Sequence, residues 1–279
     1  MVAQHHQSLI IRDITEISEM REVEHLQKEV WGVADREVFP ALALVPMIEV
    51  GGVLLGAFEG GRMAGFVFGF PGRENQKAIL HSDMLAVRPE YRCLGLGYRL
   101  KLAQRERTLA MGIETITWTF DPLQSRNARL NFGKLGVIAN SYRSDYYGAT
   151  TSFLHQTGTD RLWVTWILKS QRVKDRIQEA GLKRRMDEDA VTALRVGGDN
   201  EPLKIKVDAG ADAAVFAIEI PEDINRMLTQ DAALALRWRA ATRDAFTLLL
   251  AAGLCVTEFQ FVEREYGSVG QYLLTRRNS

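Results

Sequence analysis

The sequence contains little cysteine and no excess of either charge. Its two cysteines among 279 residues, Cys93 and Cys255, lie far apart, and neither has a partner at the spacing of a metal site. This excludes a cysteine-based metal centre and favours a reducing compartment, so we expect a cytoplasmic protein. The 35 basic side chains balance the 35 acidic ones, which gives no reason to expect a nucleic acid or an anionic membrane as a partner.

Long apolar runs are missing as well. No stretch approaches the roughly 18–20 apolar residues that a membrane-spanning helix needs, and the first residues lack the charged-then-apolar pattern of a secretory signal. We therefore expect no membrane association. Because no set of His, Cys, Asp and Glu has metal-ligand spacing, we also expect no metal. With 46% hydrophobic and 25% charged residues, the chain has a globular composition, and its length allows two domains.

The most informative stretch is residues 78–111. Alternating residues predict a strand over 79–87, and apolar residues after Gly97 recur among Arg, Lys, Gln and Glu as in an amphipathic helix. Between the two lies the turn Arg-Cys-Leu-Gly-Leu-Gly, residues 92–97. Glycines let the backbone approach a ligand closely, and the first amides of a helix have no partners within it. Such a turn attracts anions, above all a pyrophosphate.

The glycine pair alone also fits a tight turn without a ligand. A dinucleotide-binding loop does not fit, because Leu100 takes the place of its third glycine. A Walker loop is excluded, because neither Lys-Ser nor Lys-Thr follows the glycines.

The whole string L-A-V-R-P-E-Y-R-C-L-G-L-G resembles motif A of the GNAT N-acetyltransferase superfamily, in which a strand ending in L-x-V and an R/Q-x-x-G-x-G/A loop bind acetyl-coenzyme A. Arg92, Gly95 and Gly97 match that loop position by position. The resemblance implies acetyl-coenzyme A as cosubstrate, with its pyrophosphate on the loop amides and its pantetheine arm along the strand. The implied binding residues are Leu85, Ala86, Val87, Arg92, Cys93, Leu94, Gly95, Leu96, Gly97 and Tyr98. A thiolate at Cys93 would be stabilised, but the position is variable in the family and we favour a filler role.

A second segment, residues 125–137, predicts a helix stopped by Gly136. It resembles a second GNAT motif, a helix carrying N-x-x-A-x-x-x-Y that packs beside the cofactor. By this resemblance Asn127 and Phe132 contact the coenzyme. Two positions depart from the motif, because Ser125 occupies the asparagine position and Phe132 stands where many members have a tyrosine. That tyrosine is the usual candidate for protonating the leaving thiolate.

Two tyrosines just downstream, Tyr142 and Tyr146, are candidates to replace that acid. They lie in Y-R-S-D-Y-Y-G, where the chain is expected to pass close to the same site. The alternative is that these tyrosines are packing residues of a surface loop.

His81 and Asp83 are the candidate general bases. Their i, i+2 spacing predicts that both lie on the strand face that continues to Leu85 and Val87. Several family members carry Glu or His at these positions. A histidine with a pKa of about 6.5 suits a base at neutral pH, and Asp83 would orient it or bind a cationic amine. Alternatively, the pair faces solvent at the start of the strand.

The expected fold is of the α/β (α+β) class, with a GNAT-type mixed, mainly antiparallel sheet flanked by helices and a smaller α/β domain at the C-terminus. We expect an acetyltransferase domain at residues 1–169, a charged helix and linker at 170–201, and a strand-helix-strand-strand domain of unknown role at 202–279. Its long helix carries Arg237, Arg239 and Arg243, which are expected to form a solvated or interface face and not a ligand clamp. That domain would be a degenerate half of the same fold that extends the sheet, a module that forms a homodimer, or a module that covers the substrate.

The expected function is transfer of an acetyl group from acetyl-coenzyme A to the amine of a small molecule or peptide, by direct attack on the thioester. The acceptor cannot be identified from the sequence. One alternative is a non-catalytic protein that binds or senses acyl-coenzyme A, which the phenylalanine at position 132 permits. Another is a scaffold that binds no coenzyme.

Overall fold

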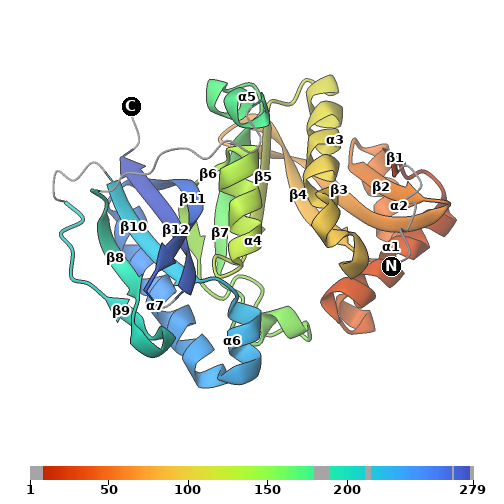
Figure 1. The fold of residues 1–279 in the computed structure, drawn as a ribbon. Coiled ribbons are helices and arrows are strands. Elements are labelled where there is room, and N and C mark those ends of the chain that lie inside the picture. The colour runs from red at the N-terminus through yellow and green to blue at the C-terminus, as the bar shows by residue number, and fades with distance from the viewer. Residues whose placement is uncertain (1–8, 179–188, 211–214, 266, 277–279) are drawn as a thin grey trace. The chain divides into compact units, whose positions relative to one another are not determined.

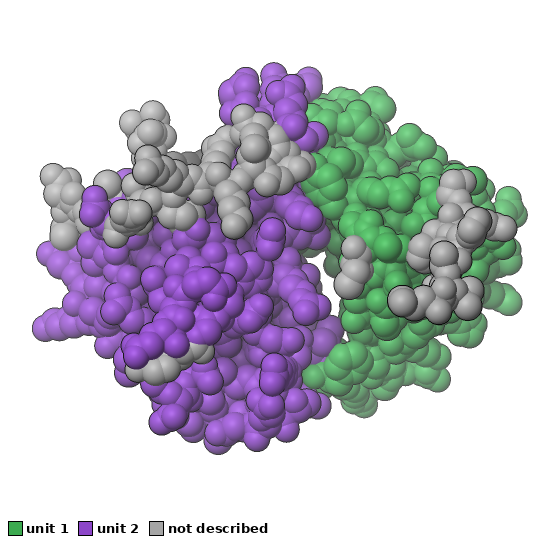
Figure 2. Space-filling model, in the orientation of Figure 1, with its two compact units in different colours: residues 1–118, 150–153 green, residues 119–149, 154–279 purple. Residues whose placement is uncertain are grey.

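A computed structural model describes residues 9–178, 189–210, 215–265 and 267–276. The chain forms two compact units (Figure 2). Unit 1 contains residues 1–118 and 150–153, and unit 2 contains residues 119–149 and 154–279. The C-terminal segment therefore shares a unit with residues 119–149. The three-part division at residues 169 and 201 stays a prediction.

Unit 1 is built from antiparallel strands and three helices (Figure 1). Its elements are β1 (Ile10–Asp13), α1 (Ile17–Trp31), η1 (Asp35–Glu37), α2 (Ala41–Glu49), β2 (Val53–Glu59), β3 (Arg62–Glu74), β4 (Lys77–Val87), η2 (Pro89–Leu94), α3 (Leu96–Ala110) and most of β5 (Thr115–Phe120). Strands β1 to β4 pair antiparallel in chain order, and β5 pairs parallel with β4. Gly60 and Gly61, both at positive φ, make the tight β2–β3 turn.

The main core of unit 1 lies between its sheet and the helices α1 and α2. Apolar residues of α1 recur on one face and pack with Phe66 and Phe68 of β3. Helix α3 packs against β2, β3 and β4. Gly69, which follows Phe68, lies against Gln104 of α3. Because successive residues of a strand point to opposite faces, α3 covers the face opposite α1 and α2.

A bulge in β4 changes the face on which His81 lies. Phe68 of β3 is paired with Met84, whereas Phe70 is paired with His81, so two steps along β3 match three along β4. The extra residue reverses the alternation. His81 therefore shares a face with Met84 and stacks near Phe70, with ring centroids 5.5 Å apart. The prediction that His81 continues the face of Leu85 was wrong, because simple alternation does not anticipate a bulge.

Unit 2 contains the remaining elements. They are α4 (Ser125–Ala128), the π-helical segment η3 (Arg129–Leu135), β6 (Ile138–Arg143), β7 (Arg161–Ile167), α5 (Gln171–Gln178), β8 (Val191–Val196), η5 (Gly198–Asn200), β9 (Pro202–Lys204), β10 (Val215–Pro221), α6 (Ile224–Gln230), α7 (Ala232–Ala251), β11 (Leu254–Arg264) and β12 (Gly267–Arg276). A short helical turn, η4 (Phe153–His155), spans the boundary between the units in sequence. The strands lie in the order β7-β6-β11-β12-β10-β8-β9, and only β10 and β8 are parallel among the described pairs. The expected mixed, mainly antiparallel sheet flanked by helices is confirmed.

Two strands of unit 2 lie where the sequence indicated none. β6 occupies the start of the segment interpreted as a possible surface loop, and β8 lies inside the expected linker. Both are paired with distant strands, β6 with β7 and β11, and β8 with β10. The expected charged helix is observed only as α5, and residues 179–188 lie outside the described part of the chain.

Two arginines of α7 are buried or half-buried ion-pair partners, not members of a solvated face. Arg239 is 3% exposed, and its guanidinium donates two hydrogen bonds to Asp121, at 2.8 and 2.7 Å. Arg243 donates to both carboxylate oxygens of Asp160, at 2.8 and 2.7 Å. The expectation of a solvated face was wrong for Arg239, because its partner Asp121 lies 118 residues away in sequence, whereas Arg237 is exposed as expected.

None of the helices in the described ranges combines the length and the apolar character needed to cross a membrane.

Candidate functional site

The glycine turn leads directly into a long helix, as the sequence predicts. η2 ends at Leu94, Gly95 has φ 68° and ψ 16°, and α3 begins at Leu96. The first backbone hydrogen bond of α3 runs from Arg99 N to Gly95 O, at 3.2 Å. The amides that precede Arg99 thus lie before the helical hydrogen-bond ladder. A Cβ at Gly95 would meet no atom within 4 Å, so the requirement for glycine is conformational and the space beside the turn is open.

Residues of the R-P-E-Y-R string hold this turn in position. Arg88 is buried and donates to Met63 O at 2.8 Å, while its guanidinium also pairs with Glu22 and Glu29. Tyr91 is buried, and its hydroxyl donates to Glu59 at 2.7 Å. The sequence analysis used these residues only as part of a family motif. Arg88 and Tyr91 near the proline were the sequence feature that could have indicated an anchored turn.

The predicted loop contains exposed residues, and an exposed arginine lies at each of its ends. Arg92 is exposed and its Nε donates to Val87 O at 3.1 Å, while Arg99 is exposed and donates to Leu9 O. The one acid in η2, Glu90, is paired with Arg62 at 3.0 Å. Leu94 and Gly95 are exposed, Gly97 and Tyr98 are half-buried, and Leu96 is buried. The side chain of Cys93 is outside the described part of the chain, so its filler role stays a prediction.

This turn fits the pyrophosphate of a coenzyme. It combines an open glycine, the first amides of a 15-residue helix and two exposed arginines, and its one acid is neutralised. The strand that leads into it also has backbone groups to offer. β3 pairs with β4 through Val87, whereas the described β4–β5 pairs are confined to Leu80 and His81. The β5 edge of β4 is therefore not paired with β5 at Leu85, Ala86 and Val87.

His81 is half-buried and has a defined hydrogen-bond partner. Its Nδ1 lies 3.1 Å from Oγ1 of Thr117 on β5. Burial lowers the pKa of His81 below its usual value, and the nearby Lys101 lowers the pKa further. The imidazole is therefore neutral at neutral pH and able to accept a proton. Asp83, in the bulge, is exposed, and partial desolvation raises the pKa of its carboxyl group.

A buried lysine lies beside His81. Lys101 of α3 is 3% exposed and donates to Ser82 Oγ at 2.7 Å and to Gln104 Oε1 at 3.2 Å. Its ammonium nitrogen is 3.7 Å from the centroid of the Trp118 ring. Burial holds the pKa of Lys101 well below its ordinary value. The sequence analysis missed this group, although Lys101, Gln104 and Thr108 form a polar stripe at helical spacing.

Tyr142 is held in a buried hydrogen-bond network. Its hydroxyl donates to Asp160 Oδ2 at 2.6 Å, and its ring stacks on Phe246 of α7. Burial and the bond to Asp160 raise the pKa of Tyr142 well above its usual range. Although burial acts in the opposite direction, hydrogen bonds from Arg243 and Tyr142 hold the pKa of Asp160 below its ordinary value. Tyr142 is thus a weak acid with an occupied hydroxyl.

Tyr146 has a more open position. It follows β6 in a turn, is 43% exposed and packs edge-to-face on Tyr147, with ring centroids 4.7 Å apart. Its backbone amide donates to Thr159 O at 3.1 Å, which fixes the turn. Of the two candidate acids, Tyr146 is exposed to solvent, whereas Tyr142 is half-buried.

The second motif forms a short α-helix that continues as a π-helical turn. Asn127 lies in α4 and is exposed. Phe132 lies in η3 and is fully buried, packed edge-to-face on Tyr272 with ring centroids 5.8 Å apart. The segment ends at Gly136, with φ 74°, as expected from the sequence. Contact of Asn127 and Phe132 with the coenzyme stays a prediction.

Within the described residues, His, Cys, Asp and Glu nowhere gather in threes as a metal ion would require.

The model of the acetyltransferase (GNAT) family matches residues 17–136, a range that contains the glycine turn and the second motif. A search among curated proteins found no match. Among solved structures, the chain is similar to the ribosomal-protein-S18-alanine N-acetyltransferase of Escherichia coli (16% identity, TM-score 0.45, covering 58% of this chain and 96% of that one). It is also similar to Ard1 of Thermoplasma volcanium (12% identity, TM-score 0.45, covering 58% of this chain and 99% of that one). A third similar structure is yncA of Salmonella typhimurium, solved with its cofactor acetyl-CoA (14% identity, TM-score 0.46, covering 59% of this chain and 96% of that one).

The segment matched by the family model runs from α1 to the end of η3 and includes Arg92, Gly95 and Gly97 of the turn. The family resemblance expected from the sequence is therefore confirmed. Residues 17–136 match the acetyltransferase (GNAT) family.

Proposed function

We propose that this protein transfers an acetyl group from acetyl-coenzyme A to the amine of a small molecule or peptide. The observation that carries the proposal is the open Gly95 turn at the start of α3, inside the segment that matches the family. Acetyl-coenzyme A supplies a reactive thioester, so that a C–N bond forms as the C–S bond breaks, the amine loses a proton and the leaving thiolate gains one.

The coenzyme would be held by backbone groups on both sides of the turn. Amides of residues 93–98 bind the pyrophosphate, and the edge of β4 at Leu85, Ala86 and Val87 pairs with the pantetheine arm. The bulge between His81 and Met84 interrupts the regular hydrogen-bond pairing of β4 with β3. Backbone amides in the bulge would polarise the thioester carbonyl.

His81 is the proposed general base. Its lowered pKa keeps the imidazole neutral, and the hydrogen bond to Thr117 orients the ring. When Nδ1–H donates to Thr117, Nε2 carries the lone pair that accepts the proton of the amine. Asp83 lies in the bulge and is exposed, and its carboxylate would attract a cationic amine.

Tyr146 is the proposed acid for the leaving thiolate. Tyr142 is a poorer candidate, because its hydroxyl is engaged by Asp160 and its pKa is raised. A cytoplasmic location, a homodimer and the identity of the acceptor stay predictions.

The test is titration calorimetry of the full chain with acetyl-coenzyme A and, separately, desulfo-coenzyme A, followed by a thiol-release assay with a panel of amines. Micromolar binding, roughly −8 kcal/mol, with amine-dependent thiol release that His81→Ala abolishes supports the enzyme. Binding without release for any amine would favour a coenzyme-sensing protein. The absence of binding to both ligands would overturn the proposal.

A further inference from the structure

The chain contains the same strand-helix-hairpin arrangement twice. The first copy runs β5, α4, β6, β7 and the second runs β10, α7, β11, β12. In both copies the helical segment ends at a glycine of positive φ, Gly136 at 74° and Gly253 at 80°, which leads into the hairpin. The hairpins of the two copies meet through antiparallel pairing of β6 with β11.

Local contacts repeat as well. After the first strand of each copy, an aspartate Oδ1 accepts from the amide two residues later, Asp121 from Leu123 at 2.9 Å and Asp223 from Asn225 at 3.0 Å. The backbone carbonyl next to each turn is bound by the other copy. Ser125 donates to Pro221 O at 2.7 Å, and Tyr272 donates to Pro122 O at 2.6 Å.

The repeat extends to a parallel strand. β5 pairs parallel with β4, whose C-terminal end leads into the glycine turn, and β10 pairs parallel with β8. Ligands of α/β proteins bind beyond the carboxyl ends of such strands. The corresponding position in the second copy is the end of β8 and β10, at Val196 and Pro221.

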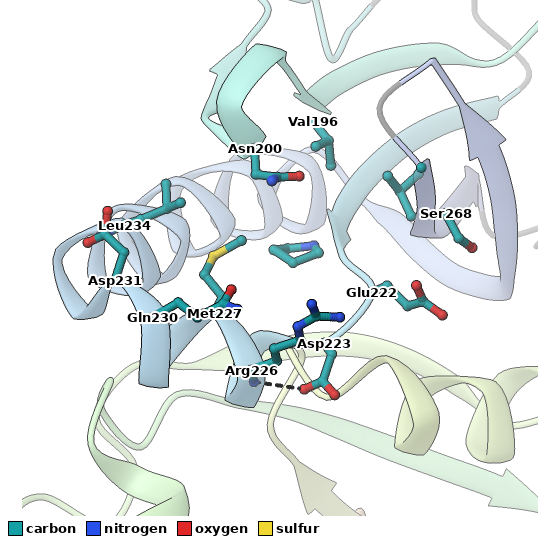
Figure 3. A pocket seen from close by; sticks show the side chains of 13 residues that line it. Val196, Asn200, Glu222, Asp223, Arg226, Met227, Gln230, Asp231, Leu234 and Ser268 are labelled. Carbon is teal, nitrogen blue, oxygen red and sulfur yellow. Dashed lines mark hydrogen bonds between the residues drawn. The ribbon is translucent and has the colours of Figure 1, made fainter.

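A pocket of about 360 Å³ lies at that position, between these strand ends, α6, the start of α7 and the start of β12 (Figure 3). Its walls are fixed from behind. The backbone amide of Val196 donates to the fully buried Glu219, which also accepts from Arg264. Trp238 Nε1 donates to Asn200 O at 2.7 Å. The volume suits a small molecule.

Two side chains of opposite charge dominate the pocket. Asp223 and Asp231 have their carboxylates engaged as helix caps, by the amides of Asn225 and Arg226 and by the amide of Leu234. Glu222 and Arg226 remain, and neither forms an ion pair with any residue in the described ranges. Figure 3 shows the ends of both side chains on the side of the pocket toward β12 and α6.

The rest of the lining is apolar or neutral. Val196, Met227, Leu234 and Val269 provide an apolar surface, and Asn200, Gln230 and Ser268 provide neutral hydrogen-bonding groups. A coenzyme pyrophosphate does not fit, because carboxylates surround the pocket and no glycine turn precedes α6 or α7. A simple anion would meet like charges at Glu222, Asp223 and Asp231, and a simple cation would meet a like charge at Arg226.

We propose that this pocket binds a free α-amino acid with an aliphatic side chain, its carboxylate on Arg226, its ammonium on Glu222 and its side chain against Leu234 and Val269. The adjacent opposite charges of such a ligand match the two unengaged groups at once. This site is separate from the glycine turn, and its existence does not depend on acetyl transfer.

The experiment is calorimetric titration of the full chain with L-leucine, L-valine and L-methionine in turn, up to about 10 mM each. Two analogues that lack one charge, 3-methylbutylamine and 4-methylpentanoate, are titrated in parallel. At least one amino acid should bind, and Arg226→Met and Glu222→Gln should each weaken that binding by about tenfold or more, because each removes a charge-assisted hydrogen bond.

Arg143→Met is the matched control, since Arg143 is exposed on β6 and does not line the pocket. It should bind the amino acid as the wild type does. Circular dichroism and thermal melting check that each variant folds. The proposal is overturned if none of the three amino acids binds, if both pocket variants bind as tightly as the wild type, or if both analogues bind as tightly as leucine.

Discussion

Nδ1 of His81 lies 3.1 Å from the hydroxyl oxygen of Thr117, a residue of the parallel neighbouring strand. When Nδ1–H donates in this hydrogen bond, Nε2 is the nitrogen that accepts a proton. Thr117→Val should shift the tautomer of His81, seen by ¹⁵N NMR, and reduce amine-dependent thiol release by about tenfold, part of what a general base contributes. Thr117→Ser keeps the hydroxyl and should preserve both. An unchanged NMR signature in Thr117→Val would show that the bond does not set the tautomer.

The lowered pKa of His81 predicts how transfer depends on pH. Because burial and Lys101 disfavour the imidazolium, the neutral base persists below the usual histidine value. The rate should stay level near neutral pH and fall only as pH drops through that lowered pKa, below roughly 6.5. A pH–rate profile of kcat/KM measures this, and an inflection above the ordinary histidine value would contradict the assignment.

Gly95 should be required for coenzyme binding because a side chain at this position would obstruct the turn, and not only because its positive φ would strain another residue. Gly95→Val places a branched side chain beside the amides at the start of α3, and acetyl-coenzyme A affinity should fall by about tenfold or more. Gly112 is the matched control, because it has φ 74°, lies just after the other end of α3 and is equally open. Gly112→Val should carry similar strain and retain coenzyme binding in calorimetry. Equal losses in both variants would indicate strain alone.

The buried pair of Arg239 and Asp121 should contribute strongly to the stability of unit 2. Arg239→Met leaves the Asp121 carboxylate buried without its partner and should lower the free energy of unfolding by about 3–5 kcal/mol. Arg237, two residues earlier, forms an exposed pair with Glu201, so Arg237→Met should change the free energy of unfolding far less. Urea denaturation measures both. A similar effect of the two variants would argue against burial as the cause.

Lys101 should make stability depend on pH. Burial lowers its folded-state pKa below 10.5, so the unfolded chain binds more protons between the two values. Stability of the wild type should therefore rise with pH across that window, by about 1.4 kcal/mol per unit of pKa difference. Lys101→Met, which keeps the apolar stem, should lack this rise in urea unfolding at successive pH values. The same slope in both proteins would exclude Lys101 as its source.

The two tyrosines should separate in their effects. Tyr146→Phe should reduce thiol release with little change in coenzyme affinity, since it removes only the proposed proton donor. Tyr142→Phe removes a buried hydrogen bond to Asp160, so its main effect should be a loss of about 1 kcal/mol or more in stability. Steady-state kinetics and denaturation together test this. Loss of turnover in Tyr142→Phe but not in Tyr146→Phe would reverse the assignment.

Local patterns determined much of the fold. Alternation predicted a strand over residues 79–87, which lies within β4, and Gly136 was predicted to end the helical segment before it. These features depend on residues close in sequence, for which the period of two and the preference of glycine for positive φ are sufficient. The glycine turn before α3 was predicted for the same reason, and the family resemblance was inferred from the motif that contains it.

Contacts between distant segments decided the rest. The bulge that turns His81 toward Phe70 arises from pairing with β3, and Thr117 reaches His81 only because β5 lies beside β4. The strands β6 and β8 form through partners far along the chain. Burial of Arg239 likewise needs the turn at Asp121, since no local pattern distinguishes it from the exposed Arg237. Sequence by itself determined the locally patterned elements and the glycine turn, whereas the tertiary structure decided the remaining strands and which polar side chains are buried together, because burial and strand pairing are non-local.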